Sequence, residues 1–190
     1  MSLTTLDIKE PGLNILPPGV ERHVVNAGGL TGLQIFPDDE IEIINDEGNQ
    51  ICEIICFDKD GKSELAILNL KENSDKSFIK EILKKKDESS LATNFQLKKR
   101  NLDLNKSHSS ILFDEKTPSG EKIKLKSKDK CYVIFSAPQN DMLVSEQNPS
   151  GDLILFVKRA KITNDKELSI IPDPVFEPHY EKNIDRQTAI

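Results

Sequence analysis

Two cysteines, Cys52 and Cys56, are the first residues whose type and spacing suggest chemistry, because cysteine thiolates are good zinc ligands. The residues between them are typical of a β-strand, in which four residues span roughly 13 Å at ~3.3 Å per residue. One metal ion cannot reach both thiols across that span, so the pattern favours two small apolar side chains in a core. The same interpretation applies to Cys131, which begins the apolar run 131–135.

Three histidines, His23, His108 and His179, are the other candidate ligands or bases. No two of them have the spacing of a metal-binding pair. His23, His108 and Cys131 are therefore pocket candidates only if the fold brings them together. The sequence predicts no catalytic residue and no metal ligand, and it leaves the cofactor-binding residues unknown.

Glycines at 28, 29 and 32 resemble a phosphate-binding loop, but a strand follows them where a dinucleotide site needs a helix. Lysines at 122, 124 and 126 alternate with apolar residues, as on the solvent face of a strand. With a formal net charge of −6 and only 5% aromatic residues, the composition argues against a nucleic-acid partner.

Alternating apolar residues and turn signals predict most of the elements that would position these side chains. Residues 20–70 are expected to form an antiparallel meander, with turns at 46–49 and 58–61. Its strands cover residues 20–25, 28–36, 40–44, 51–57 and 64–70. Further strands are expected over residues 110–113, 122–126, 131–135, 153–157 and 168–171.

Between the two sets of strands, Phe78, Ile79, Ile82 and Leu83 have the spacing of one helix face. A helix is expected from 75 to 86, capped by residue 74 or 75, whereas residues 89–97 fit either a second short helix or a loop. The sequence predicts a mainly β fold, an antiparallel β-sandwich or distorted barrel with one short helical insertion. We expect a β-rich domain over residues 1–163, with the insertion around 75–97, and a strand with a proline-rich strap or linker over 164–190.

The 190 residues are 36% hydrophobic and 31% charged, the composition of a soluble globular chain. No apolar run reaches the ~18 residues of a membrane span, and the N-terminus lacks the apolar stretch of a signal peptide. Three cysteines are too few for a disulfide scaffold. We therefore expect a cytoplasmic protein with no membrane partner, and homo-oligomer formation stays open.

Three segments resemble known families. Residues 16–23, followed by 38–50, resemble the opening of urea-carboxylase-associated domains, and residues 131–142 resemble a later core region of that family. The ending, 171–174 through 185–190, resembles the lead-in to another such domain, in bacterial proteins that continue into a glycine-cleavage T-protein-like aminomethyltransferase.

The resemblance implies an accessory β-domain of a tetrahydrofolate-dependent aminomethyltransferase in one-carbon, methylated-amine or glycine metabolism, non-catalytic by itself. Its partners would be downstream domains of the same chain, and tetrahydrofolate would be the cofactor of the parent protein. Two alternatives stay open. One is a stand-alone domain that binds a small molecule near His23 and Gly28, and the other is a metal-dependent hydrolase using His108 or Cys131.

Overall fold

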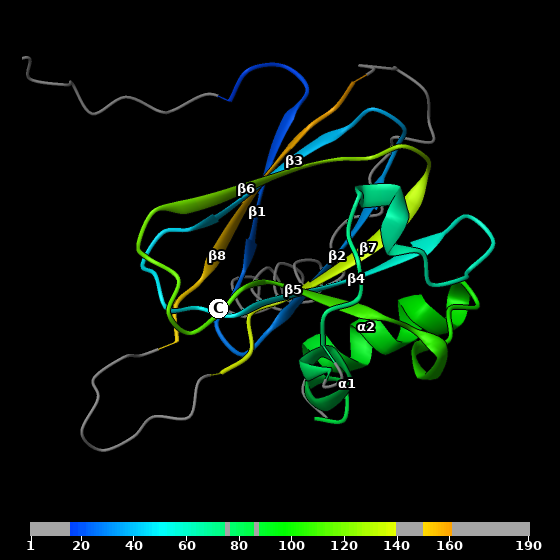
Figure 1. Ribbon diagram of the computed structural model, residues 1–190. Coiled ribbons are helices and arrows are strands. Elements are labelled where there is room, and N and C mark those ends of the chain that lie inside the picture. The colour runs from blue at the N-terminus through cyan, green and yellow to red at the C-terminus, as the bar shows by residue number, and fades with distance from the viewer. Residues whose placement is uncertain (1–15, 75–76, 86–87, 140–149, 161–190) are drawn as a thin grey trace, which may run out of the picture.

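The computed structural model describes residues 16–74, 77–85, 88–139 and 150–160 (Figure 1). Within these residues, two four-stranded sheets face each other. Sheet A has the strand order β1-β8-β3-β6, and sheet B has the order β2-β7-β4-β5. The strands are β1 (Val20–Val25), β2 (Leu30–Ile35), β3 (Glu40–Asn45), β4 (Cys52–Asp58), β5 (Ser109–Phe113), β6 (Glu121–Lys126), β7 (Cys131–Ser136) and β8 (Leu153–Lys158).

Every strand pair is antiparallel, and the pairing follows a simple rule. Strand β1 pairs with β8, β2 with β7, β3 with β6, and β4 with β5. This is the pairing of one long hairpin wound around itself, as in a jelly roll. The expected mainly β, antiparallel sandwich is confirmed.

The expected meander over residues 20–70 is wrong. Strands β1 and β3 belong to sheet A and β2 and β4 to sheet B, so the chain crosses between the sheets after each of the first three strands. The turn at 46–49 therefore joins two sheets and closes no hairpin. Alternation of apolar residues shows which face of a strand is buried, but it does not show which strand lies beside it.

The expected strand at 64–70 is also wrong, because this segment contains the 3₁₀ helix η1 (Leu65–Leu68). The carboxylate of Glu64 accepts a hydrogen bond from the Ala66 amide at 3.2 Å. Asn69 ends the helix in a left-handed conformation, with φ 58°. An apolar run this short fits a partly buried helical turn as well as a strand.

The main hydrophobic core lies between the sheets. Ile41 and Ile43 of β3 and Leu155 of β8 contribute from sheet A, and Ile54 of β4 and Phe135 of β7 from sheet B. All five are fully buried. Because side chains alternate along a strand, the neighbours of these residues point away from the core, to the outer faces of the sandwich.

Two helices cover the outer face of sheet B, α1 (Phe78–Ile82) and α2 (Glu88–Lys99). They pack on it through Ile79, Ile82 and Leu97, which join a second apolar cluster with Ile55 and Phe57 of β4. The expected helix at 75–86 is thus shorter than predicted, and the question left open at 89–97 is answered by a helix.

The cap expected at residue 74 or 75 is wrong, because the Ser77 side chain accepts the Lys80 amide at the start of α1. A second 3₁₀ turn, η2 (Leu104–Lys106), leads into β5. Among the described residues, no helix is long and apolar enough to cross a membrane. The strand expected at 168–171 and the strap that follows lie outside the described residues, and the domain division stays a prediction.

Candidate functional site

A groove of about 600 Å³ lies on the outer face of sheet A, the side opposite the two helices. This volume falls in the range of small-molecule sites. We call it the sheet A groove. It is lined by Leu16, Pro17, Val20, Glu40, Ile41, Glu42, Lys124, Leu125, Lys126, Phe156 and Lys158.

Strand register places the polar and aromatic residues of the groove in two rows. In one row Lys158 of β8 lies between Val20 of β1 and Glu40 of β3. In the next row, Glu42 of β3 lies between Phe156 of β8 and Lys124 of β6. Side chains directly opposite each other on one face are about 4.5–5.5 Å apart at Cβ, so each row is a set of neighbours.

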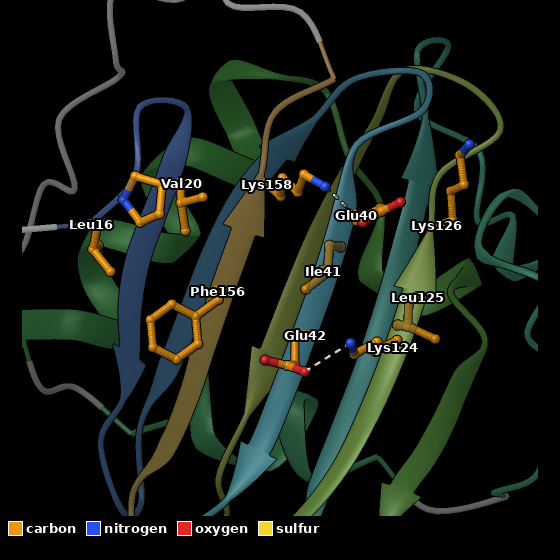
Figure 2. Close-up of a pocket in the computed structure, with 11 residues that line it drawn as sticks. Leu16, Val20, Glu40, Ile41, Glu42, Lys124, Leu125, Lys126, Phe156 and Lys158 are labelled. Carbon is orange, nitrogen blue, oxygen red and sulfur yellow. Dashed lines mark ion pairs between the residues drawn. The ribbon is translucent and has the colours of Figure 1, made fainter.

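Both rows carry cross-strand ion pairs. Lys124 Nζ lies 3.3 Å from Glu42 Oε1, and Lys158 Nζ lies 3.8 Å from Glu40 Oε2 (Figure 2). The lysine side chains are 79% and 69% exposed. Pairs this exposed contribute only about 0–1 kcal/mol. A ligand that carries both a positive and a negative charge can therefore replace one of these ion pairs at little cost in free energy.

The apolar part of the groove is formed by Phe156 together with Leu16, Pro17 and Val20. Phe156 is half-buried, and Figure 2 shows its ring on the same side of the sheet as the Glu42 carboxylate. An aromatic face beside a carboxylate attracts cations, particularly ones whose surface is apolar.

Arg159 follows the groove residue Lys158 and joins the end of β8 to β1, β2 and the turn before β3. Its Nε and Nη2 donate to the two oxygens of Glu21 at 2.8 Å each. Its Nη1 donates to Asp39 Oδ2 at 2.7 Å and to the Gln34 carbonyl oxygen at 2.9 Å. We call this set the Arg159 clamp. Glu21 and Asp39 adjoin groove residues in the chain, so the clamp fixes the strand ends that form this end of the groove.

The positive charge of Arg159 and the carboxylates of the clamp stabilise one another. Burial by itself raises the pKa of Glu21, but hydrogen bonds from His23 and Arg159 outweigh it and lower that pKa to about 2. Burial likewise works against the Arg159 charge, while Glu21 and Asp39 raise the pKa of the guanidinium above its usual value. Glu21 and Arg159 are therefore both ionised at neutral pH.

The three pocket candidates from the sequence have separate surroundings. His23 Nε2 lies 3.1 Å from Glu21 Oε2, and His108 Nδ1 lies 2.9 Å from Glu72 Oε2. Cys131 is buried at the start of β7. None of the contacts found among the described residues joins two of these candidates. Their role in a pocket stays a prediction.

The cysteines pack in the core, as the sequence indicated, and none is in a disulfide. Cys131 Sγ lies 3.6 Å from Ser127 Oγ. A hydrogen bond between Cys56 and Cys131 raises the pKa of Cys56 and lowers that of Cys131. Within the described part of the chain, no group of three or more histidine, cysteine or acidic side chains is placed to hold a metal ion.

A buried carboxyl group on sheet B was not recognised from the sequence. Glu53 is fully buried, and its Oε2 accepts the Ile79 amide at 2.6 Å and the Ser136 hydroxyl at 3.5 Å. Burial raises the pKa of Glu53, and these hydrogen bonds only partly offset that effect. The carboxyl group thus anchors the start of α1 to sheet B.

The sequence analysis did not single out the groove residues either. The lysines of β6 were interpreted as solvent-facing, and Glu40, Glu42 and Phe156 only as parts of expected strands. That interpretation was correct for each strand alone. The signal missing from the sequence is the register that places Phe156 beside Glu42 and Glu42 beside Lys124.

No model of a known protein family matches the chain. A comparison with curated proteins finds a trimethylamine-oxide aldolase from Ruegeria pomeroyi, 30% identical over 182 residues. The match covers 96% of this chain and 23% of the aldolase. The chain therefore spans about a quarter of the length of this relative.

This match corrects the functional expectations from the sequence. The relative is named an aldolase, and neither comparison supports an aminomethyltransferase or a urea-carboxylase-associated domain. The expectation of an accessory domain of a tetrahydrofolate-dependent aminomethyltransferase is therefore wrong. The alternatives, a stand-alone binding domain and a metal-dependent hydrolase, find no support either. Tetrahydrofolate as a cofactor stays an untested prediction.

Proposed function

We propose that this chain is part of an enzyme that acts on trimethylamine oxide or a closely related small amine oxide. The observation that carries the proposal is the alignment with a trimethylamine-oxide aldolase over 96% of the chain. An alignment that runs through nearly every element supports a common fold for the matched part. The activity belongs to the relative, and its transfer to this chain is our inference.

The reaction class has a definite product. An aldolase releases an aldehyde, and the only carbons of trimethylamine oxide are its methyl groups. The aldehyde is therefore formaldehyde, and the remaining amine is dimethylamine. One methyl C–H bond, its C–N bond and the N–O bond break, while a C=O and an N–H bond form. The methyl carbon is oxidised as the N–O bond is reduced, so atoms and electrons balance without an external oxidant.

The sheet A groove supports this proposal because it offers what a small dipolar substrate needs. It combines an aromatic ring, two carboxylates and three lysine ammonium groups in a volume of about 600 Å³. Few polar groups on a mainly apolar lining are typical of small-molecule sites.

The test is an assay of the protein expressed from its complete gene. We expect formaldehyde and dimethylamine to appear in equal amounts when it is incubated with trimethylamine oxide. The Ruegeria relative, assayed in parallel, is the positive control. If the relative releases formaldehyde under these conditions and the folded protein releases none, the proposal is wrong.

A further inference from the structure

We infer that the sheet A groove binds small methylated ammonium compounds, with the methylated nitrogen against Phe156 and Glu42 and a ligand oxygen on Lys124. The choice of trimethylamine oxide as the ligand rests on the proposed function. The assignment of the groove rests on the geometry of three adjacent strands.

The first requirement of such a ligand is a surface for its methyl groups. A trimethylated nitrogen carries positive charge under an apolar surface and cannot donate a hydrogen bond. Aromatic rings bind such cations through their faces, as in the recognition of choline and methyl-lysine. Phe156 is the aromatic residue of the groove, and Leu16, Pro17 and Val20 extend its apolar lining.

The second requirement is negative charge near the nitrogen. Glu42 lies opposite Phe156 in the strand register, and its side chain is 28% exposed. This partial burial limits the screening of its charge by water. A methylated cation between Phe156 and Glu42 therefore receives both a cation–π and a charge–charge interaction.

The third requirement is a donor for the ligand oxygen, which Lys124 provides. Its Nζ is 3.3 Å from Glu42 Oε1, and its side chain is 79% exposed. The ammonium group can rotate from Glu42 toward an oxide without leaving a buried charge unpaired. The ligand then replaces one exposed ion pair by two, with its nitrogen on Glu42 and its oxygen on Lys124.

Charge balance favours a dipolar ligand over a simple anion or cation. The groove holds Glu40 and Glu42 against Lys124, Lys126 and Lys158. Lys126 also contacts Asp38 at 3.0 Å, so each lysine has a carboxylate partner. A ligand with one charge would leave one partner of a pair without a counter-charge.

The binding experiment uses the 190-residue chain and NMR contacts between ligand methyl protons and phenylalanine ring protons. A thermal shift is unsuitable, because trimethylamine oxide at high concentration stabilises proteins by exclusion from their surfaces. Phe156→Leu is the test variant, and Phe95→Leu is its matched control. Phe95 is 63% exposed on α2, which packs on sheet B.

We expect trimethylamine oxide to show methyl-to-ring contacts that Phe156→Leu abolishes and Phe95→Leu retains. An exposed cation–π contact implies that Phe156→Leu weakens binding by about two- to five-fold. Glu42→Gln should weaken binding as well, whereas Glu121→Gln, an exposed change on β6, should not. Tetramethylammonium, which lacks the oxygen, should bind more weakly to Phe156→Leu, whereas Lys124→Gln should not weaken its binding.

The neutral isostere tert-butanol has the same shape without the charges, and we expect it to show no such contacts. Equal contacts from tert-butanol, or equal affinity in wild type and Phe156→Leu, would overturn the inference. Binding without formaldehyde release would contradict only the proposed function. Formaldehyde release that is unaffected by Phe156→Leu, with no contacts to the ring, would contradict only the groove assignment.

Discussion

Arg159 is a largely buried charged residue that bonds to three acceptors. Its side chain is 12% exposed, and Asp39 beneath it is 3% exposed. The arginine is suited to this position because its planar fork donates to two carboxylates and a carbonyl at once. A lysine in its place could not meet all three acceptors.

We expect Arg159→Ala to lower the free energy of unfolding by about 3 kcal/mol, because it leaves the buried Asp39 carboxylate without its counter-charge. Urea denaturation measures the change. The control is Arg22→Ala, which removes an exposed arginine from β1 and should change stability by less than about 0.5 kcal/mol. Equal effects of the two changes would show that the clamp does not stabilise the fold.

The clamp also predicts a pH dependence at low pH. The pKa of Glu21 is about 2 in the folded protein against 4.5 for the free side chain. The stability that the ionised Glu21 carboxylate gives to the fold is therefore fully present above pH 4.5. This contribution of Glu21 to stability should decrease as the pH falls from 4.5 to about 2. The stability difference between wild type and Glu21→Gln, followed by denaturation across this range, should shrink toward acid. A constant difference would contradict the assignment.

Glu53 predicts a dependence of the opposite sign. Burial raises its pKa in the folded state, so the folded protein holds this proton more tightly than the unfolded chain. The stability of wild type relative to Glu53→Gln should therefore fall as the pH rises from 4.5 through the folded-state pKa. Glutamine keeps an acceptor for the Ile79 amide. Denaturation of both proteins at pH 4 and pH 7 measures this difference. A rise in the stability of the wild type relative to Glu53→Gln toward pH 7 would contradict the prediction.

At the scale of the elements, two glycine turns show how closely the turn after β3 approaches the turn before β6. Gly48 follows β3 with φ 80°, and a Cβ built on it would lie 2.6 Å from the Ser119 amide nitrogen. Gly120 precedes β6 with φ 77°, but a Cβ there meets nothing within 4 Å. The two sites therefore share the backbone conformation and differ in their free space.

Replacing each glycine by alanine separates the cost of the left-handed backbone from the cost of steric overlap. Gly120→Ala should cost about 1–2 kcal/mol for the left-handed backbone alone. Gly48→Ala should cost a further ~1–3 kcal/mol, because the new methyl group displaces backbone atoms. Thermal or urea unfolding of both variants measures the difference. Equal losses would mean that the approach to Ser119 is not a constraint.

The sequence predicts elements well where a single strand determines them. The expected bounds of β1 agree with the structure, and those of most other strands differ by one or two residues, because alternation and turn residues are local signals. Prediction failed at 64–70, where Glu64 and Asn69 provide the start and end of a short helix. An apolar run of this length does not distinguish a short helix from a strand.

At the scale of the whole molecule, the sheet order could not be predicted in the same way. The sandwich follows from many short amphipathic strands, but the pairing of β1 with β8 joins segments more than a hundred residues apart. The candidate site has the same origin, because Glu42, Lys124 and Phe156 meet only through that long-range register. Composition and spacing therefore indicate the class of fold and leave the groove unseen.

The proposed activity and the sheet A groove meet at substrate binding, so steady-state kinetics on trimethylamine oxide examine both together. We compare formaldehyde release by the wild type, Phe156→Leu and Phe95→Leu in the protein expressed from its complete gene. We expect Phe156→Leu to raise KM by about two- to five-fold with little change in kcat, because the change weakens substrate binding. Phe95→Leu should match the wild type. An unchanged KM in Phe156→Leu, or the same rise in both variants, would contradict this expectation.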